Sequence, residues 1–160
     1  MAINEWLKDH PRVLEAVYRF TSRLMHGSKP VFERLGYGRA ERVFIPAEQV
    51  TKEWIFDCKM CGQCVLHSTG MTCPETCPKN LRNGPCGGVR ADGRCEVIPE
   101  MTCMWVNAWN RSQSLGEYGD EIHVVRPPVN RALVGTSAWL NDVRGIDQET
   151  PAGWQAASEN

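Results

Sequence analysis

The chain has 160 residues, a formal net charge of −1 and a sequence pI of about 6.4. This near-neutral balance gives no long-range attraction to nucleic acid or anionic lipid, so we expect neither nucleic acid nor a membrane as a partner. No apolar run approaches the roughly twenty residues that span a bilayer, and the N-terminus lacks the pattern of a secretory signal. We therefore expect a cytoplasmic protein with one domain plus tails.

Residues 1–45 are expected to form an N-terminal helical docking segment. Pro11 marks the first turn of a helix that ends near Gly27, and Lys29-Pro30 begins a shorter helix that ends at Gly36 or Gly38. The longer helix is amphipathic, so it either packs on its own domain or binds a partner. Its apolar positions recur at helical spacing: Val13, Leu14, Val17, Tyr18, Phe20 and Leu24.

The second predicted unit, residues 46–125, is a cysteine-rich metal-cluster domain. We expect a brief strand at Val43–Ile45 before it and a connection that starts at Pro46. Trp54 and Phe56 are expected to shield the metal core. A helix is expected from Pro99-Glu100 onward, with Trp105 and Trp109 in the core, and the alternation at 121–125 predicts a short strand. Residues 126–160 are expected to form an extended C-terminal arm that is disordered after Asp147.

All eight cysteines lie in a stretch rich in glycine and proline that cannot bury enough apolar area to order itself. In a reducing compartment cysteines more often bind metal than form disulfides. We therefore predict a small protein of helices and irregular structure whose loop-rich metal-cluster core has ferredoxin-like ligand spacing. The candidate metal and cofactor ligands are Cys58, Cys61, Cys64, Cys73, Cys77, Cys86, Cys95 and Cys103.

The opening Cys-x-x-Cys-x-x-Cys at residues 58–64 favours iron–sulfur clusters, because three thiolates at this spacing can wrap one cubane. Structural zinc more often uses two separate pairs of ligands. We expect two 4Fe-4S clusters, with one 4Fe-4S cluster plus one zinc as the main alternative, and all-zinc or disulfides as further ones. The preferred grouping joins Cys77 to the triplet and assigns the other four to a second cluster. Exchanging Cys73, Cys77 or Cys103 between the two groups is nearly as plausible.

Other polar residues near the cysteines give weaker indications of a role at the metal sites. His67 is close enough to the triplet to be a ligand, but with eight cysteines it is better interpreted as a supporting or surface residue. Lys79, Arg82, Arg90 and Arg94 can offset the charge of thiolate-bound clusters, meet an anionic cofactor on a partner, or simply be solvated. The sequence has no nucleophile–base pair, P-loop or dinucleotide fingerprint, so we assign no catalytic residue and expect no independent catalysis.

The motifs at residues 58–88, which include Cys-Pro-Glu-Thr-Cys-Pro-Lys and Arg-Asn-Gly-Pro-Cys-Gly-Gly, resemble the methylene-tetrahydrofolate reductase C-terminal domain, also found as the separate MetV-type subunit. The resemblance covers roughly residues 50–140. It implies a partner, a flavin-bearing barrel subunit that reduces methylene-tetrahydrofolate, with the flavin on that partner and not on this chain. The chain would then be an accessory subunit that supplies metal centres and an electron path.

Two functional hypotheses follow from these patterns. In the first, the chain is an electron-transfer subunit of an oxidoreductase in one-carbon metabolism, receiving electrons from ferredoxin or another carrier and relaying them to the partner flavin. In the second, it is a zinc-stabilised structural adaptor that positions the flavoprotein without a redox role.

Overall fold

The structure is a computed structural model that describes residues 3–149. Within that range it is mostly helical, and its single β pairing is an isolated bridge between Arg94 and Thr102. The α-helices are α1 (Ile3–Asp9), α2 (Pro11–Gly27), α3 (Lys29–Leu35), α4 (Tyr37–Phe56), α5 (Met104–Ser112) and α6 (Ala138–Arg144). Short 3-10 turns are η1 (Leu66–Thr69), η2 (Pro74–Thr76), η3 (Gly119–His123), η4 (Arg131–Leu133) and η5 (Ile146–Gln148). None of the described helices is long and apolar enough to cross a bilayer.

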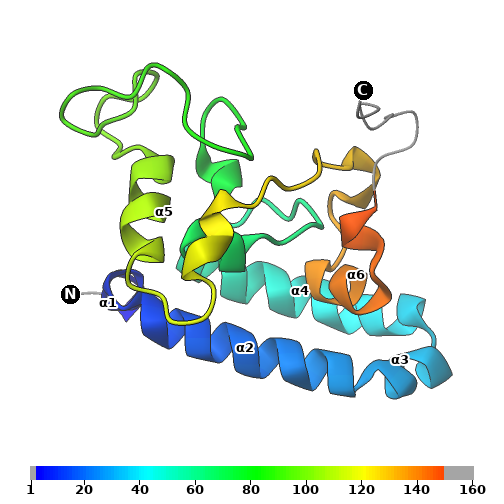
Figure 1. The fold of residues 1–160 in the computed structure, drawn as a ribbon. Coiled ribbons are helices and arrows are strands. Elements are labelled where there is room, and N and C mark those ends of the chain that lie inside the picture. The colour runs from blue at the N-terminus through cyan, green and yellow to red at the C-terminus, as the bar shows by residue number, and fades with distance from the viewer. Residues whose placement is uncertain (1–2, 150–160) are drawn as a thin grey trace, which may run out of the picture.

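Helices α1–α4 form one side of the molecule, and the cysteine-rich loops and α5 lie on the other (Figure 1). The expected helices at Pro11–Gly27 and Lys29–Leu35 are confirmed. Each has proline in its first turn, where the missing amide hydrogen costs nothing. Gly36 has a φ of 84°, a conformation that glycine adopts without steric cost, and it separates α3 from α4.

The expected strand at Val43–Ile45 and the connection from Pro46 are wrong, because both segments lie inside the 20-residue helix α4. Pro46 removes one amide donor and leaves the carbonyl of Arg42 without its helical partner. Arg42 is exposed, so water can satisfy that carbonyl. The helix continues through the proline because packing on other elements, which include α1 and α3, stabilises it.

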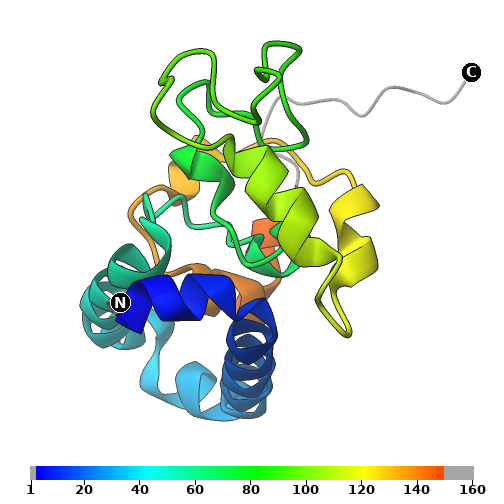
Figure 2. The ribbon, with the colours of Figure 1, turned by 90° about the vertical axis from the view of Figure 1, so that its left-hand side faces the viewer.

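The cysteine-rich segment contains 3-10 turns and loops between α4 and α5 (Figure 2). Helix α5 begins at Met104, five residues later than Pro99, because residues 95–103 form a turn. The expected strand at 121–125 is wrong: residues 119–123 form η3, whose carbonyls and amides bond within the turn.

The C-terminal segment lies over the N-terminal helices, but it is not simply extended. Helix α6 begins after Ser137, whose hydroxyl accepts a hydrogen bond from the amide of Leu140, and it ends at Gly145 in the left-handed conformation. Leu140 and Val143 of α6 pack in one core with residues from the N-terminal helices: Met25, Phe32 and Ala40. Residues 148 and 149 are ordered here, and the rest of the expected disordered end lies outside the described residues.

The burial of the aromatic residues differs from the expectation. Trp105 is buried and Phe56 is half-buried, whereas Trp54 and Trp109 are about half exposed. Trp54 therefore does not shield the core, and Trp109 contributes only part of its surface. Two further apolar clusters contain cysteines: one includes Cys64 and Cys73, and the other includes Cys77 and Cys103. In both clusters the thiols therefore pack directly among the apolar side chains.

Candidate metal centres

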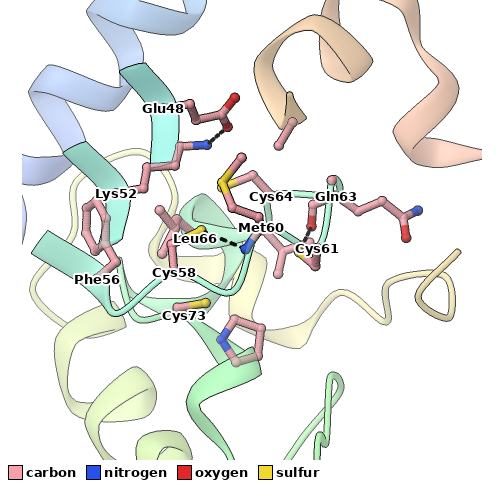
Figure 3. A pocket seen from close by; sticks show the side chains of 14 residues that line it. Glu48, Lys52, Phe56, Cys58, Met60, Cys61, Gln63, Cys64, Leu66 and Cys73 are labelled. Atoms are coloured by element: carbon pink, nitrogen blue, oxygen red, sulfur yellow. Dashed lines mark hydrogen bonds and ion pairs between the residues drawn. The ribbon is translucent and has the colours of Figure 1, made fainter. Parts of the chain in front are cut away.

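Four cysteines line one cavity beneath α4 (Figure 3). Cys73 is buried, and the three cysteines of the opening triplet are half-buried. Most of the remaining wall is apolar. The four cysteines of this first cavity are Cys58, Cys61, Cys64 and Cys73.

The loop that carries the triplet needs unusual backbone conformations. Asp57 and Met60 have φ values of 55° and 50°, and Gly62 has a φ of 75°. A Cβ atom at Gly62 would collide with the backbone carbonyl of Leu133, so any larger residue would displace the C-terminal segment. These turns allow three cysteines within seven residues to face one cavity. The glycine in the triplet is therefore a packing requirement as well as a turn residue.

The C-terminal segment fixes this loop from behind. The Gln63 side chain accepts a hydrogen bond from the amide of Asn130 (2.6 Å) and donates one to the carbonyl of Asp147 (2.6 Å). The side-chain amide of Asn141 donates to the carbonyl of Gly62 (2.8 Å). Gln63 and Asn141 are each about 1% exposed, so these bonds form away from water. The expected arm thus has a structural task, which is to hold the first cysteine loop.

The other four cysteines line a second cavity beside α5. The amide of Cys95 donates to the carbonyl of Met101, and the amide of Cys103 donates to that of Gly93, each over 2.9 Å. This turn brings two buried cysteines together, and the loop before it supplies the other two. An ion pair between Lys79 and Glu96 joins the two loops. The cysteines of the second cavity are Cys77, Cys86, Cys95 and Cys103.

This division exchanges Cys73 and Cys77 relative to the preferred grouping from the sequence, within the alternatives left open there. The short turn η2 separates the two residues and sends their side chains to different cavities. All eight thiols are free, and none forms a disulfide. Within residues 3–149, no three His, Cys, Asp or Glu side chains are close enough together to hold a single metal ion.

Burial makes the thiols of the first cavity hard to ionise. Burial is the largest influence on three of these thiols: it raises the pKa of Cys58 to about 11 and that of Cys73 to about 12, and it also raises the pKa of Cys61. A metal centre reverses this preference, because a coordinated thiol loses its proton to the cation. One buried and three half-buried cysteines in a mainly apolar wall therefore suit the ligands of a thiolate-ligated cluster, and they fit poorly as free reactive thiols.

Two cations flank the first cavity, and one was not predicted. Lys52 is 5% exposed and forms an ion pair with Glu48 one turn earlier in α4. Burial alone would lower the pKa of Lys52, but the charge that Cys64 can carry, followed by that of Glu48, outweighs burial and raises it. In the sequence, a Glu and a Lys four residues apart look like an ordinary solvent-exposed helical pair.

The second cation, Arg82, belongs to the Arg-Asn-Gly-Pro-Cys motif, which joins the two cavities. Arg82 is buried, and its Nη2 donates to the carbonyl of Gln63 in the first loop (3.1 Å). Asn83 exchanges two hydrogen bonds of 2.9 Å with the backbone of Arg126, and Cys86 lines the second cavity. Of the four predicted compensating cations, Arg82 is buried, whereas Lys79, Arg90 and Arg94 are more exposed.

His67 lies near the first loop but faces other partners. Its Nδ1 accepts the hydroxyl hydrogen of Tyr18 (3.0 Å), and its Nε2 donates to the carboxylate of Glu121 (3.2 Å). Burial and, to a smaller degree, the charge of Arg126 lower the pKa of His67 to about 4, so the ring is neutral. It does not line either cysteine cavity. His67 connects α2 to η3 as a supporting residue.

The fold and these cavities define a small helical protein built around two groups of four cysteines. A comparison with known protein families matches residues 37–132 to the family described as "Methylene-tetrahydrofolate reductase C terminal". The match covers more than half of the chain, and the chain belongs to that family. The match begins earlier than the motifs suggested and includes the whole of α4, so Glu48 and Lys52 lie inside the family region. No curated protein and no solved structure matches the chain.

Proposed function

We propose that the chain is the iron–sulfur electron-transfer subunit of a methylene-tetrahydrofolate reductase-type complex and relays electrons to a flavin-bearing barrel partner. The family assignment indicates the association with the reductase. The observation that carries the redox role is the division of eight cysteines into two cavities with four each. Cys58, Cys61, Cys64 and Cys73 would hold one 4Fe-4S cluster, and Cys77, Cys86, Cys95 and Cys103 the other. When bound, such clusters accept and donate single electrons.

The two cavities are close enough for a relay. Cys73 and Cys77 are four positions apart, so their Cα atoms are at most about 14 Å apart even for a fully extended chain. The turn η2 between them shortens that distance. Each cavity has a mainly apolar wall, which excludes water and lets the protein set the potential of a cluster through burial and hydrogen bonds.

A partner also needs a surface, and the N-terminal helices offer one. Nine large apolar side chains on α2, α3 and α4 are between 38% and 70% exposed. They follow helical spacing on α2 and on α4, so each set lies along one face of its helix. Rows of exposed apolar residues along a helix are typical of interaction sites. We call this set the helical face: Val13, Val17, Phe20, Leu24, Val31, Leu35, Val43, Val50 and Trp54.

The charges on the same helices indicate what kind of surface would cover the helical face. Six basic residues of α2–α4 are exposed, against two acidic ones, although the whole chain has a net charge of −1. A partner with an apolar patch and an acidic rim would be complementary to this excess of positive charge. We assign the helical face to the barrel subunit. The basic residues are Arg12, Arg23, Lys29, Arg34, Arg39 and Arg42, and the acidic ones are Glu33 and Glu53.

Metal content decides between the relay and the zinc adaptor. Protein purified without oxygen should contain about eight iron and eight acid-labile sulfide per chain, as two cubanes require. It should also give an EPR signal after reduction. A colourless protein with stoichiometric zinc and no iron would contradict the relay and support the adaptor.

Docking is tested separately by the substitution Phe20→Asp on the co-expressed complex with the flavoprotein. A charge at this 69% exposed position should weaken the affinity for the flavoprotein by about tenfold or more if the side chain is buried on binding. Val125→Asp is the matched control, because Val125 is 80% exposed and lies outside α2–α4. Equal affinities for both variants, with iron content unchanged, would show that the flavoprotein binds elsewhere.

A further inference from the structure

The buried cation Lys52 lies against the first cysteine cavity in a way that ordinary helix packing does not explain. Its side chain leaves α4 and helps to line the cavity together with the four cysteines. In Figure 3 the ammonium group lies between the Glu48 carboxylate and the Cys64 side chain. A lysine that is 95% buried has lost nearly all of its hydration, so its position needs compensation from fixed neighbours.

Those neighbours come from two parts of the chain. Glu48 pairs with the ammonium and also accepts a hydrogen bond of 2.7 Å from the hydroxyl of Ser137, which is fully buried. The Trp139 ring faces the ammonium at 4.8 Å from its centroid, a cation–π arrangement. Ser137 and Trp139 both belong to the C-terminal segment. The charge of Lys52 is therefore held in one place and cannot swing out to solvent.

Lys52 and Glu48 both help to line the first cavity, so the orientation of the pair decides which charge the cysteines meet. The charge that Cys64 can carry stabilises the ammonium more than the charge of Glu48 does, and Lys52 in turn favours the thiolate of Cys58. The pair as a whole is neutral, but in Figure 3 its ammonium end lies on the side of Cys64 and the Glu48 carboxylate lies beyond it. Such an oriented, desolvated pair creates a positive potential at the sulfur ligands.

We propose that the charge of Lys52 raises the reduction potential of the centre in the first cavity. This inference rests on the proposed iron–sulfur function and deepens it. Reduction adds one negative charge to a cluster that is already anionic with its four thiolates, and the fixed ammonium stabilises the reduced form more than the oxidised form. Glu48, Ser137 and Trp139 act through Lys52 by holding it in place. The wall of the second cavity contains Lys79 and Glu96 instead of Lys52, and Lys79 is exposed, so water and salt screen its charge.

The test measures reduction potentials in the holoprotein by EPR-monitored redox titration under anaerobic conditions. In Lys52→Met, the equilibrium constant for one-electron reduction of the first centre should fall about tenfold, which is about 59 mV toward more negative potential. The second centre should not change. Lys52→Arg keeps the charge and should stay within about threefold of the wild-type constant. Lys59→Met is the matched control, because Lys59 follows Cys58 directly but is exposed, where water and salt screen its charge.

A second variant separates electrostatics from folding. Lys52→Met leaves the Glu48 carboxylate buried and unpaired and can unfold the site, whereas Glu48→Met with Lys52→Met replaces the whole pair by apolar side chains, a change that is often neutral or stabilising. The double variant should load iron and show the negative shift at the first centre. Wild-type potential in the double variant would overturn the role of Lys52 and leave the relay intact. Absence of iron in the wild type would instead overturn the proposed function itself.

Discussion

The side-chain amide of Asn141 lies 2.8 Å from the backbone carbonyl of Gly62, although the two residues are 79 positions apart. Asn141 belongs to α6, and Gly62 lies inside the first cysteine triplet. The same amide also donates to the hydroxyl of Thr136 (2.7 Å), so both of its hydrogens are used. The geometry of the first cavity therefore depends on a helix from the other end of the chain.

Asn141→Asp tests this dependence, because it keeps the shape of the side chain and removes both donors. The carbonyl of Gly62 would lose its buried partner and face a carboxylate, so the free energy of unfolding should fall by about 1–3 kcal/mol or more. Denaturant unfolding of the anaerobic holoprotein measures this loss, and iron analysis should show reduced loading of the first centre. Asn110→Asp, at an exposed position of α5, is the control and should change stability by less than about 0.5 kcal/mol. An equal effect at both positions would argue against a special role for Asn141.

The exchange of Cys73 and Cys77 between cavities gives a second prediction. Cys73→Ser should remove the centre held by the opening triplet, and Cys77→Ser should remove the one beside α5, because each removes one of four thiolates. EPR spectra can identify which signal is lost. The reference variants are Cys61→Ser for the first cavity and Cys95→Ser for the second. If Cys73→Ser instead loses the same signal as Cys95→Ser, the grouping preferred from the sequence is right and the one in the structure is wrong.

The features that depend only on neighbouring residues could be predicted from the sequence. Proline at the start and glycine at the end define α2 without reference to the rest of the fold, and the triplet spacing indicates one shared site. Cys73 and Cys77 could not be assigned in this way. Each is followed by proline, so the local sequences are alike, and the turn between them decides which cavity each one joins.

Long-range packing determines the features of the fold and the site that the sequence did not predict. Pro46 is a sound reason to end a helix, yet α4 continues because other helices hold both halves. The pair Glu48 and Lys52 has the spacing of a solvent-exposed ion pair, and only the position of Ser137 and Trp139 shows that it is buried. A signal did exist: a thiolate-ligated cluster would be anionic, and a lysine six residues before the first cysteine is a candidate to offset its charge.

His67 gives a pH-dependent prediction. Its pKa is about 4 in the folded protein, mainly because of burial, against an ordinary value of 6.5. Between these values the unfolded chain binds a proton that the folded chain does not, so the free energy of unfolding should fall as the pH decreases from 6.5 to 4. The slope is at most about 1.36 kcal/mol per pH unit. In His67→Gln this part of the slope should be absent, as unfolding monitored by circular dichroism would show. His26→Gln, at an exposed position of α2, should keep it, and an unchanged slope in His67→Gln would contradict the prediction.

Glu15 gives the opposite kind of pH dependence and tests how α2 is attached to the cysteine-rich part. Its buried carboxylate accepts hydrogen bonds from the backbone amides of Gly116, Glu117 and Tyr118 at 2.8–3.0 Å. Burial alone would raise the pKa of Glu15, but these three bonds outweigh it and lower the pKa below the ordinary value of 4.5.

Glu15→Gln should therefore lower the free energy of unfolding by about 1.5–3 kcal/mol at pH 7, since hydrogen bonds to a charged acceptor are lost and one amide meets the NH₂ group. The stabilisation by the carboxylate is complete above pH 4.5 and disappears as the pH falls through the lower folded pKa, so the wild type and the variant should converge in acid. Parallel unfolding curves of both proteins across pH 3–7 measure this convergence. Glu33→Gln, at an exposed position of α3, should follow the wild type throughout. A constant difference between the wild type and Glu15→Gln at every pH would mean that the shape of the side chain, and not its charge, holds α2 in place.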